Sequence, residues 1–254
     1  MYNELIKIGP VTVYGYGFMI AVGILCALWM TARRAKKREA DIDIVYSLAL
    51  IALLFGFVGA KVLFCIVEFK RILANPMEIF SGSGFVVYGG IIGGTAAVLL
   101  YCRKKRVRFL PYFDLIAPSV AVAQGFGRIG CFLAGCCYGR ETDSLFGIVF
   151  HDSPVAPNGV RLIPTQLIMS AGNFLIAALL ILYAKKPRAA GKVGALYLIM
   201  YSIGRFGVEF LRNDYRGSVG VLSTSQLIAL FIFILGTAIL FKDKLFRKKQ
   251  NAGL

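Results

Sequence analysis

The chain has 254 residues, of which 58% are apolar and only 17% are charged. Soluble domains have about 45–50% apolar and about 25% charged residues, so this composition excludes an ordinary soluble protein and predicts an all-α polytopic membrane protein. A net charge of +16 would suggest nucleic-acid binding in a soluble protein. Here the basic residues form short clusters between apolar runs, so membrane topology explains them and we expect no nucleic-acid partner.

Seven apolar runs each approach the roughly 20 residues that a helix needs to cross the hydrocarbon core of a bilayer. In chain order they cover about residues 11–32, 44–66, 85–102, 112–136, 165–184, 193–211 and 221–241. No soluble domain and no low-complexity tract separates them. We therefore expect seven transmembrane helices in a single integral-membrane domain over residues 1–254.

Four basic clusters follow the first, third, fifth and seventh apolar runs. They hold 19 of the 29 Lys and Arg residues and cover residues 33–38, 103–108, 185–192 and 242–249. Cytoplasmic loops of membrane proteins are enriched in Lys and Arg, so we expect the N-terminus outside and the C-terminus in the cytoplasm. An odd number of spans agrees with this orientation.

Three basic residues, Lys61, Arg128 and Arg205, lie within apolar runs or at their ends. A cation near the bilayer centre costs about 2.5–3.5 kcal/mol on insertion scales, so it is retained where it reaches the interface, a partner or a ligand. For Lys61 the simplest interpretation is a side chain that extends to the interface. The two arginines share helix faces with polar neighbours, which favours a protein partner or a ligand.

Arg205, Glu209 and Arg212 have the spacing i, i+4, i+7, which places them on one side of a helix. One carboxylate can balance only one guanidinium group, so this group of three keeps a positive charge. Two interpretations stay open, a satisfied network between helices and an anion site near the outer leaflet. The excess positive charge favours the anion site.

Residues 125–130 read GFGRIG and fit the pattern G-x-G-x-x-G of dinucleotide-binding loops. That fingerprint belongs to a strand–loop–helix unit of a soluble domain, whereas these glycines lie in an apolar span. We exclude a dinucleotide site and expect close helix packing or a bend near a ligand. The spacing i, i+4, i+7 recurs here in Gln124, Arg128 and Cys131. The same two interpretations apply, a satisfied network between helices and an anion site near the outer leaflet.

Cys131, Cys136 and Cys137 raise the question of a metal site. Zinc sites usually need four ligands with a second Cys or His pair, and the chain has one histidine, His151, and no such pair. The three cysteines could be small apolar residues, polar residues of a binding site, or metal or redox ligands. We expect no metal and no cofactor.

Five segments, in order along the chain, resemble the prolipoprotein diacylglyceryl transferase family. Residues 13–17 (VYGYG) resemble its tyrosine–glycine motif, and residues 84–94 (GFVVYGGIIGG) its glycine-rich motif. Residues 113–143 are similar to its signature segment, 161–167 (RLIPTQL) to its proline–glutamine motif, and 204–214 (GRFGVEFLRND) to its arginine–glutamate motif. Together these matches are specific and cover nearly the whole chain.

The resemblance implies an enzyme of the bacterial cytoplasmic membrane that modifies lipoprotein precursors. Its donor would be phosphatidylglycerol, and its acceptor the thiol of a lipobox cysteine in a prolipoprotein. The products would be a thioether-linked diacylglycerol and glycerol 1-phosphate. The nucleophile would come from the substrate, so the enzyme would need no serine or cysteine nucleophile of its own.

The resemblance also assigns site residues. The family's functional positions match Tyr16, Arg128, Gly139, Arg205, Glu209 and Arg212. Tyr88 stands where well-studied members have histidine, and Cys131 and Cys136 stand where the signature usually has asparagine and glutamate.

These assignments fit the chemistry of a phosphate leaving group, because fixed cations in a dry site stabilise the charge that develops on oxygen. We expect Arg128 and Arg205 to fill this role and Glu209 to orient one of them. Tyr16 and Tyr88 would hydrogen-bond the headgroup or relay a proton. The substrate-binding residues would be Arg128, Gly139, Arg212, Gln124, Cys131 and Cys136.

Two alternatives stay open at this point. A carrier or exporter of an anionic lipid or solute would use the same positive groups, although the inverted repeats common in carriers are not evident. A relative of the family with another thiol or lipid substrate would explain Tyr88, Cys131 and Cys136.

Overall fold

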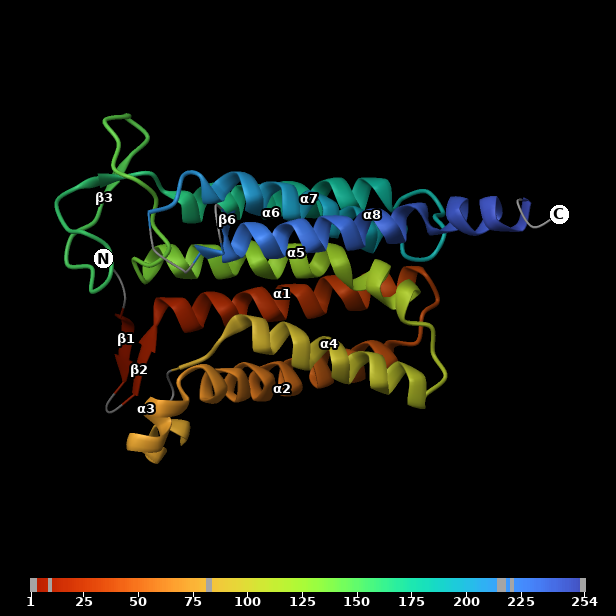
Figure 1. Ribbon diagram of the computed structural model, residues 1–254, viewed down its shortest axis with the longest axis horizontal. Helices are drawn as coiled ribbons and strands as arrows, with labels where there is room; N and C mark the ends of the chain where they lie inside the picture. Colours follow the sequence, from red (N-terminus) through yellow and green to blue (C-terminus); the bar gives the residue numbers. More distant parts are fainter. Residues whose placement is uncertain (1–3, 9–10, 81–83, 214–217, 220–221, 252–254) are drawn as a thin grey trace. The chain divides into compact units, whose positions relative to one another are not determined.

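The computed structural model describes residues 4–8, 11–80, 84–213, 218–219 and 222–251 (Figure 1). They form two compact units, of which the first combines Met1–Thr31 with Phe113–Leu254 and the second is Ala32–Tyr112. The two units are described separately below.

Seven long helices correspond to the seven predicted spans. They are α1 (Gly15–Lys37), α2 (Ile42–Val67), α4 (Val87–Lys104), α5 (Phe109–Leu133), α6 (Thr165–Tyr183), α7 (Lys192–Glu209) and α8 (Thr224–Asn251). The short helix α3 (Phe69–Ala74) and the 3₁₀ helix η1 (Pro76–Phe80) follow α2. Among the described residues α1, α2, α5, α6 and α8 are long and apolar enough to cross a membrane. The predicted class, an all-α polytopic membrane protein, is confirmed.

The helices α4 and α7 are shorter than those five, so a window of 18 residues has to include their charged residues. Both have 18 residues, and the last turn of α4 contains Arg103 and Lys104. Helix α7 includes Lys192, Arg205 and Glu209. Charged side chains lower the mean hydropathy of any window that covers these helices, so composition alone identifies them less clearly as spans.

Short antiparallel strand pairs accompany the helices, and the sequence analysis did not predict them. They are β1 (Glu4–Ile8) with β2 (Val11–Tyr14), β3 (Ile148–Val149) with β4 (Arg161–Leu162), and β5 (Ser218–Val219) with β6 (Leu222–Ser223). The first predicted span therefore starts too early, because residues 11–14 (VTVY) are extended and α1 begins at Gly15. Val and Thr are β-branched and favour extended backbone at this boundary.

In the first unit α5 packs against α1, α6 and α7. Its glycines explain the G-x-G-x-x-G pattern, since residues 125–130 are helical throughout. A Cβ on Gly125 would lie 2.8 Å from the Phe174 ring of α6, and one on Gly130 would lie 3.2 Å from the Tyr16 ring of α1. Gly125 and Gly130 therefore allow close helix packing, one of the two expected roles, whereas a Cβ on Gly127 would meet nothing within 4 Å.

A buried carboxylate joins α5 to the start of α7. Asp114 is 5% exposed, and its two carboxylate oxygens accept hydrogen bonds from the backbone N–H groups of Gly191 at 2.6 Å and Gly194 at 2.7 Å. The first N–H groups of a helix have no partner within the helix and form its positive end. Asp114 thus caps α7 from a neighbouring helix.

In the second unit α2 and α4 pack through glycines. A Cβ on Gly59 would lie 3.1 Å from the Cα of Gly93 and would overlap the carbonyl oxygen of Gly89. A Cβ on Gly93 would lie 2.7 Å from the carbonyl oxygen of Phe55. Small residues let helix backbones approach closely in membranes, where van der Waals contact drives association. The glycine-rich segment 84–94 supplies one side of this contact.

Lys61 lies in the second unit, where its ammonium group has partners within the protein. Its Nζ donates to the carbonyl oxygen of Glu78 at 3.2 Å and lies 5.0 Å from the Phe85 ring centroid and 5.3 Å from that of Phe64. Aromatic faces and a carbonyl oxygen stabilise a cation in an apolar setting.

We predict that Gly59→Ala destabilises the protein, whereas Gly56→Ala on the same helix does not. Both changes add helix propensity, but only the Cβ at residue 59 meets backbone atoms, since the nearest atom at Gly56 is 3.7 Å away. Overpacking of this kind costs about 1–3 kcal/mol. Thermal unfolding in detergent should show a lower midpoint for Gly59→Ala only. Equal midpoints for the two variants would contradict the packing argument.

We also predict that Asp114→Ala lowers stability by about 2–4 kcal/mol, because two buried N–H groups lose their acceptor. Thermal or denaturant unfolding in detergent measures the change. Asp143→Ala removes an exposed carboxylate and serves as the control. If the two variants unfold alike, the cap contributes nothing to stability.

Candidate functional site

The backbone reverses direction directly after α5. The N–H of Cys136 donates to the carbonyl oxygen of Cys131 at 3.1 Å, and that of Gly135 donates to Phe132 at 3.1 Å. Gly135 has φ 66° and Cys137 has φ 63°, so both lie in the left-handed region that commonly ends a helix. This turn places residues 136 and 137 beside the last turn of the helix from which they came.

The first turn of α6 holds this reversed segment. The side-chain amide of Gln166 donates to the carbonyl oxygen of Cys136 at 2.7 Å, and the hydroxyl of Thr165 donates to that of Cys137 at 2.7 Å. Both side chains are fully buried. Neither residue was predicted as a site residue from the sequence. A polar Thr-Gln pair after Pro164, at the start of an apolar helix, is the signal that could have identified them.

Gly139 lies where three chain segments meet. Its N–H donates to the carbonyl oxygen of Ile163 at 3.0 Å, and it forms an antiparallel bridge with Arg212. A Cβ at this position would lie 2.6 Å from the carbonyl oxygen of Ile163 and 2.8 Å from that of Leu211. Only glycine fits without displacing backbone, so Gly139 fixes the distance between the loop after α5 and the end of α7.

The guanidinium group of Arg128 lies near a thiol. Its Nη1 is 4.0 Å from Sγ of Cys131, and no carboxylate lies within ion-pair distance among the residues that the structure describes. The Tyr16 ring packs beside Gly130, two residues after Arg128 in α5.

A second group of charges lies at the end of α7. The Glu209 carboxylate accepts from Nη1 of Arg205 at 2.5 Å and is 4.0 Å from Nε of Arg212. Arg205 also donates from Nη2 to the hydroxyl of Ser225 in α8 at 2.6 Å. The three charged side chains are at most 10% exposed. The predicted group of three therefore exists, with one carboxylate for two guanidinium groups.

Gln124 and Tyr88 complete the predicted site residues, and His151 was not among them. Gln124 accepts a hydrogen bond from the Tyr197 hydroxyl at 2.9 Å, so its amide oxygen joins α5 to α7. Tyr88 is half-buried in the first turn of α4 and belongs to the second unit. His151 is exposed in the loop between β3 and β4.

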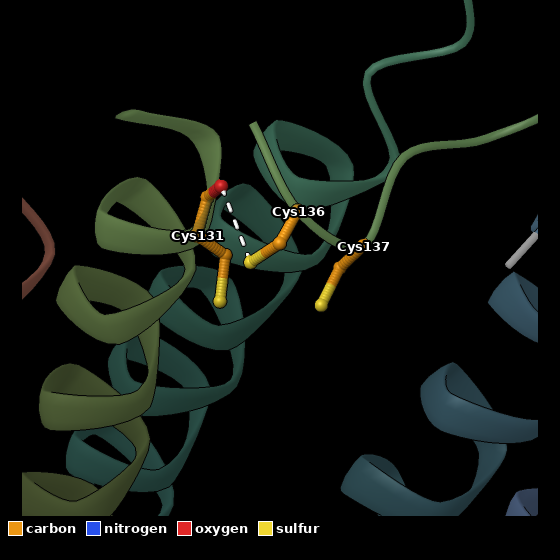
Figure 2. A group of neighbouring side chains, drawn as sticks. All are labelled: Cys131, Cys136 and Cys137. Atoms are coloured by element: carbon orange, nitrogen blue, oxygen red, sulfur yellow. Dashed lines mark hydrogen bonds between the residues drawn. The ribbon is translucent and has the colours of Figure 1, made fainter. Parts of the chain in front are cut away.

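The structure brings the three signature cysteines together. The Sγ atoms of Cys131, Cys136 and Cys137 lie within 4.8 Å of one another, and all three residues carry free thiols. Figure 2 shows the three sulfur atoms gathered on one side of the reversed segment, with the Cys136 thiol donating to the carbonyl oxygen of Cys131 at 3.6 Å. The spacing of the three cysteines in the sequence did not predict whether their sulfur atoms lie close together.

The site thus combines the Arg128 guanidinium group, three thiols and a tyrosine near the C-terminal end of α5. Gly139 ties it to Arg212, which follows the end of α7, and so to Arg205 within that helix. The planar donors of buried guanidinium groups suit the oxygen atoms of a phosphate. This arrangement favours a phosphate-bearing ligand.

Comparison with known proteins identifies the family. Residues 3–242 match the sequence profile of the prolipoprotein diacylglyceryl transferase family. The chain is 48% identical to the phosphatidylglycerol–prolipoprotein diacylglyceryl transferase of Clostridium tetani, over 96% of this chain and 98% of the relative. It is 46% identical to transferase 2 of Clostridium perfringens, over 94% of each chain, and 31% identical to a Dehalococcoides mccartyi transferase, over 96% of this chain and 94% of that one. The chain therefore belongs to the prolipoprotein diacylglyceryl transferase family.

Proposed function

We propose that this membrane protein transfers the diacylglyceryl group of phosphatidylglycerol to prolipoproteins. The observation that carries the proposal is the identity of 48% with a transferase of that name, over nearly the full length of both chains. The bacterial relatives and the helices able to span a membrane place the protein in the bacterial cytoplasmic membrane. The acceptor is the thiol of a lipobox cysteine.

The proposal includes seven spans in one integral-membrane domain, with the N-terminus outside and the C-terminus in the cytoplasm. The family match runs through both compact units, and the position of each long helix corresponds to an apolar run. Basic residues end α1 and α4 and lie between α6 and α7, which supports a cytoplasmic position for these ends. The loop after α5 and the end of α7 then face the outer leaflet.

In the reaction the acceptor sulfur attacks the carbon of the diacylglycerol moiety that carries the phosphate ester. A carbon–sulfur bond forms, the carbon–oxygen bond breaks, and glycerol 1-phosphate leaves while the thiol proton passes to the product phosphate or to solvent. Negative charge builds on the leaving phosphate, and fixed cations in a dry site stabilise it. Arg128 and Arg205 supply these cations, and Glu209 orients Arg205.

The other site residues position the donor. Arg212 recruits the headgroup, and Cys131 and Cys136 line the headgroup site. Gly139 fixes the distance between the loop after α5 and the segment that follows α7. Gln124 fixes Tyr197 beside α5. Tyr16 and Tyr88 hydrogen-bond the headgroup or relay a proton.

We predict that Arg128→Ala or Arg205→Ala lowers the transfer rate by at least about 100-fold, because removal of one donor to a developing oxyanion has that effect in enzymes. Release of labelled glycerol phosphate measures the rate, and monodispersity in detergent checks folding. His151→Ala should retain the rate, since this side chain is exposed in a loop. Full activity in either arginine variant would contradict the assigned role.

A second test separates the transferase from a carrier. Purified protein receives labelled phosphatidylglycerol with a lipobox peptide, or with the same peptide in which serine replaces the cysteine. We expect glycerol phosphate only with the cysteine peptide, because the thiol is the nucleophile. Movement of intact lipid between vesicles without cleavage would support the carrier instead.

A further inference from the structure

The three-thiol group of Cys131, Cys136 and Cys137 has the spacing of a metal site. Three atoms no more than 4.8 Å apart share a centre within about 2.8 Å of each, and a Zn–S bond is about 2.3 Å long. A contraction of about 0.5 Å per sulfur would therefore bring all three into bonding distance, which side-chain rotation can supply.

The backbone around the thiols is held in place before any ion arrives. Cys131 lies in the last turn of α5, and the carbonyl oxygens of Cys136 and Cys137 accept hydrogen bonds from Gln166 and Thr165 at 2.7 Å each. The left-handed conformation of Cys137 turns the chain back toward the helix. Groups that orient metal ligands in this way raise the affinity of a site, because the ligands lose less conformational freedom on binding.

The local charge also fits a thiolate-bound cation. A divalent ion with three thiolates carries a net charge of −1, and each thiol loses its proton to solvent when the metal–sulfur bond forms. The Arg128 guanidinium, 4.0 Å from Sγ of Cys131, stabilises that negative complex. Thiolates select soft ions such as Zn²⁺ and Cd²⁺ over Mg²⁺ and Ca²⁺.

We propose that Cys131, Cys136 and Cys137 form a three-thiolate site for a thiophilic metal ion, with Zn²⁺ as the physiological candidate. This departs from the expectation, drawn from sequence spacing, that the chain holds no metal. Three protein ligands leave one tetrahedral position open for water or another ligand. Cys131, Cys136 and Arg128 also belong to the proposed headgroup site, so a bound ion would occupy part of that site, and its binding is measured apart from the transfer reaction.

The test uses the full chain in detergent, reduced with a phosphine and freed of metal. Co²⁺ is added without oxygen, and thiolate-to-cobalt charge-transfer absorption is followed and then displaced with Zn²⁺. We expect saturation at one ion per chain, no displacement by Mg²⁺, and weaker binding at lower pH because protons compete for the thiolates. X-ray absorption of the zinc form should give three sulfur neighbours at about 2.3 Å.

Serine variants locate the site. Cys131→Ser, Cys136→Ser and Cys137→Ser should each weaken Co²⁺ binding at least tenfold. A combined variant, Cys26→Ser with Cys65→Ser and Cys102→Ser, removes the other free cysteines and should bind like the parent. In that background zinc should protect three thiols from maleimide. This measurement remains possible even if a single variant fails to fold.

Three results would overturn the proposal. They are the absence of the charge-transfer band in the parent, its loss in the combined variant, and full maleimide labelling of the three thiols in the presence of zinc. All of these readouts are independent of catalysis. A failed transfer assay would therefore not contradict the proposed metal site. An active enzyme that binds no metal would contradict it.

Discussion

The Glu209 carboxylate accepts a hydrogen bond from Arg205 at 2.5 Å and lies 4.0 Å from Arg212, and all three side chains are nearly buried. A buried ion pair needs good geometry and further hydrogen bonds to offset its desolvation, and Arg205 gains one from Ser225. Within this group one carboxylate lies beside two guanidinium groups. The proposed function uses this excess positive charge to hold an anionic phosphate.

Backbone contacts position this charge group relative to the thiols. The bridge between Gly139 and Arg212 ties the loop after α5 to the end of α7, and Gln166 and Thr165 hold the same loop from α6. In a low-dielectric setting every polar backbone group needs a partner, so these irregular segments are tolerated because protein groups satisfy them. The result is a site built on three helix ends, with little freedom to move its cations apart.

Much of the fold could be predicted because its signals are local. The seven long helices match apolar runs, and the segment G-x-G-x-x-G lies within a helix, where two of its glycines allow the expected close packing. Helical spacing was sufficient to place Arg205 beside Glu209, since a helix fixes neighbours four residues apart. Arg212 also lies near Glu209 as predicted, but it follows the end of α7 and is held there by its bridge to Gly139. Helical spacing did not predict the hydrogen-bond partner of Gln124, because that partner, Tyr197, belongs to another helix.

The sequence by itself determined that the protein is a helical membrane protein, where its long helices lie and which cations are unusual, because hydrophobicity and helical periodicity act over short stretches of chain. Only the tertiary structure decided that three cysteines meet, that Asp114 caps α7 and that Gly139 must be glycine. These features depend on hydrogen bonds and close contacts between segments far apart in the chain. No local pattern encodes them, because each partner acquires its role only when packing brings the other within reach.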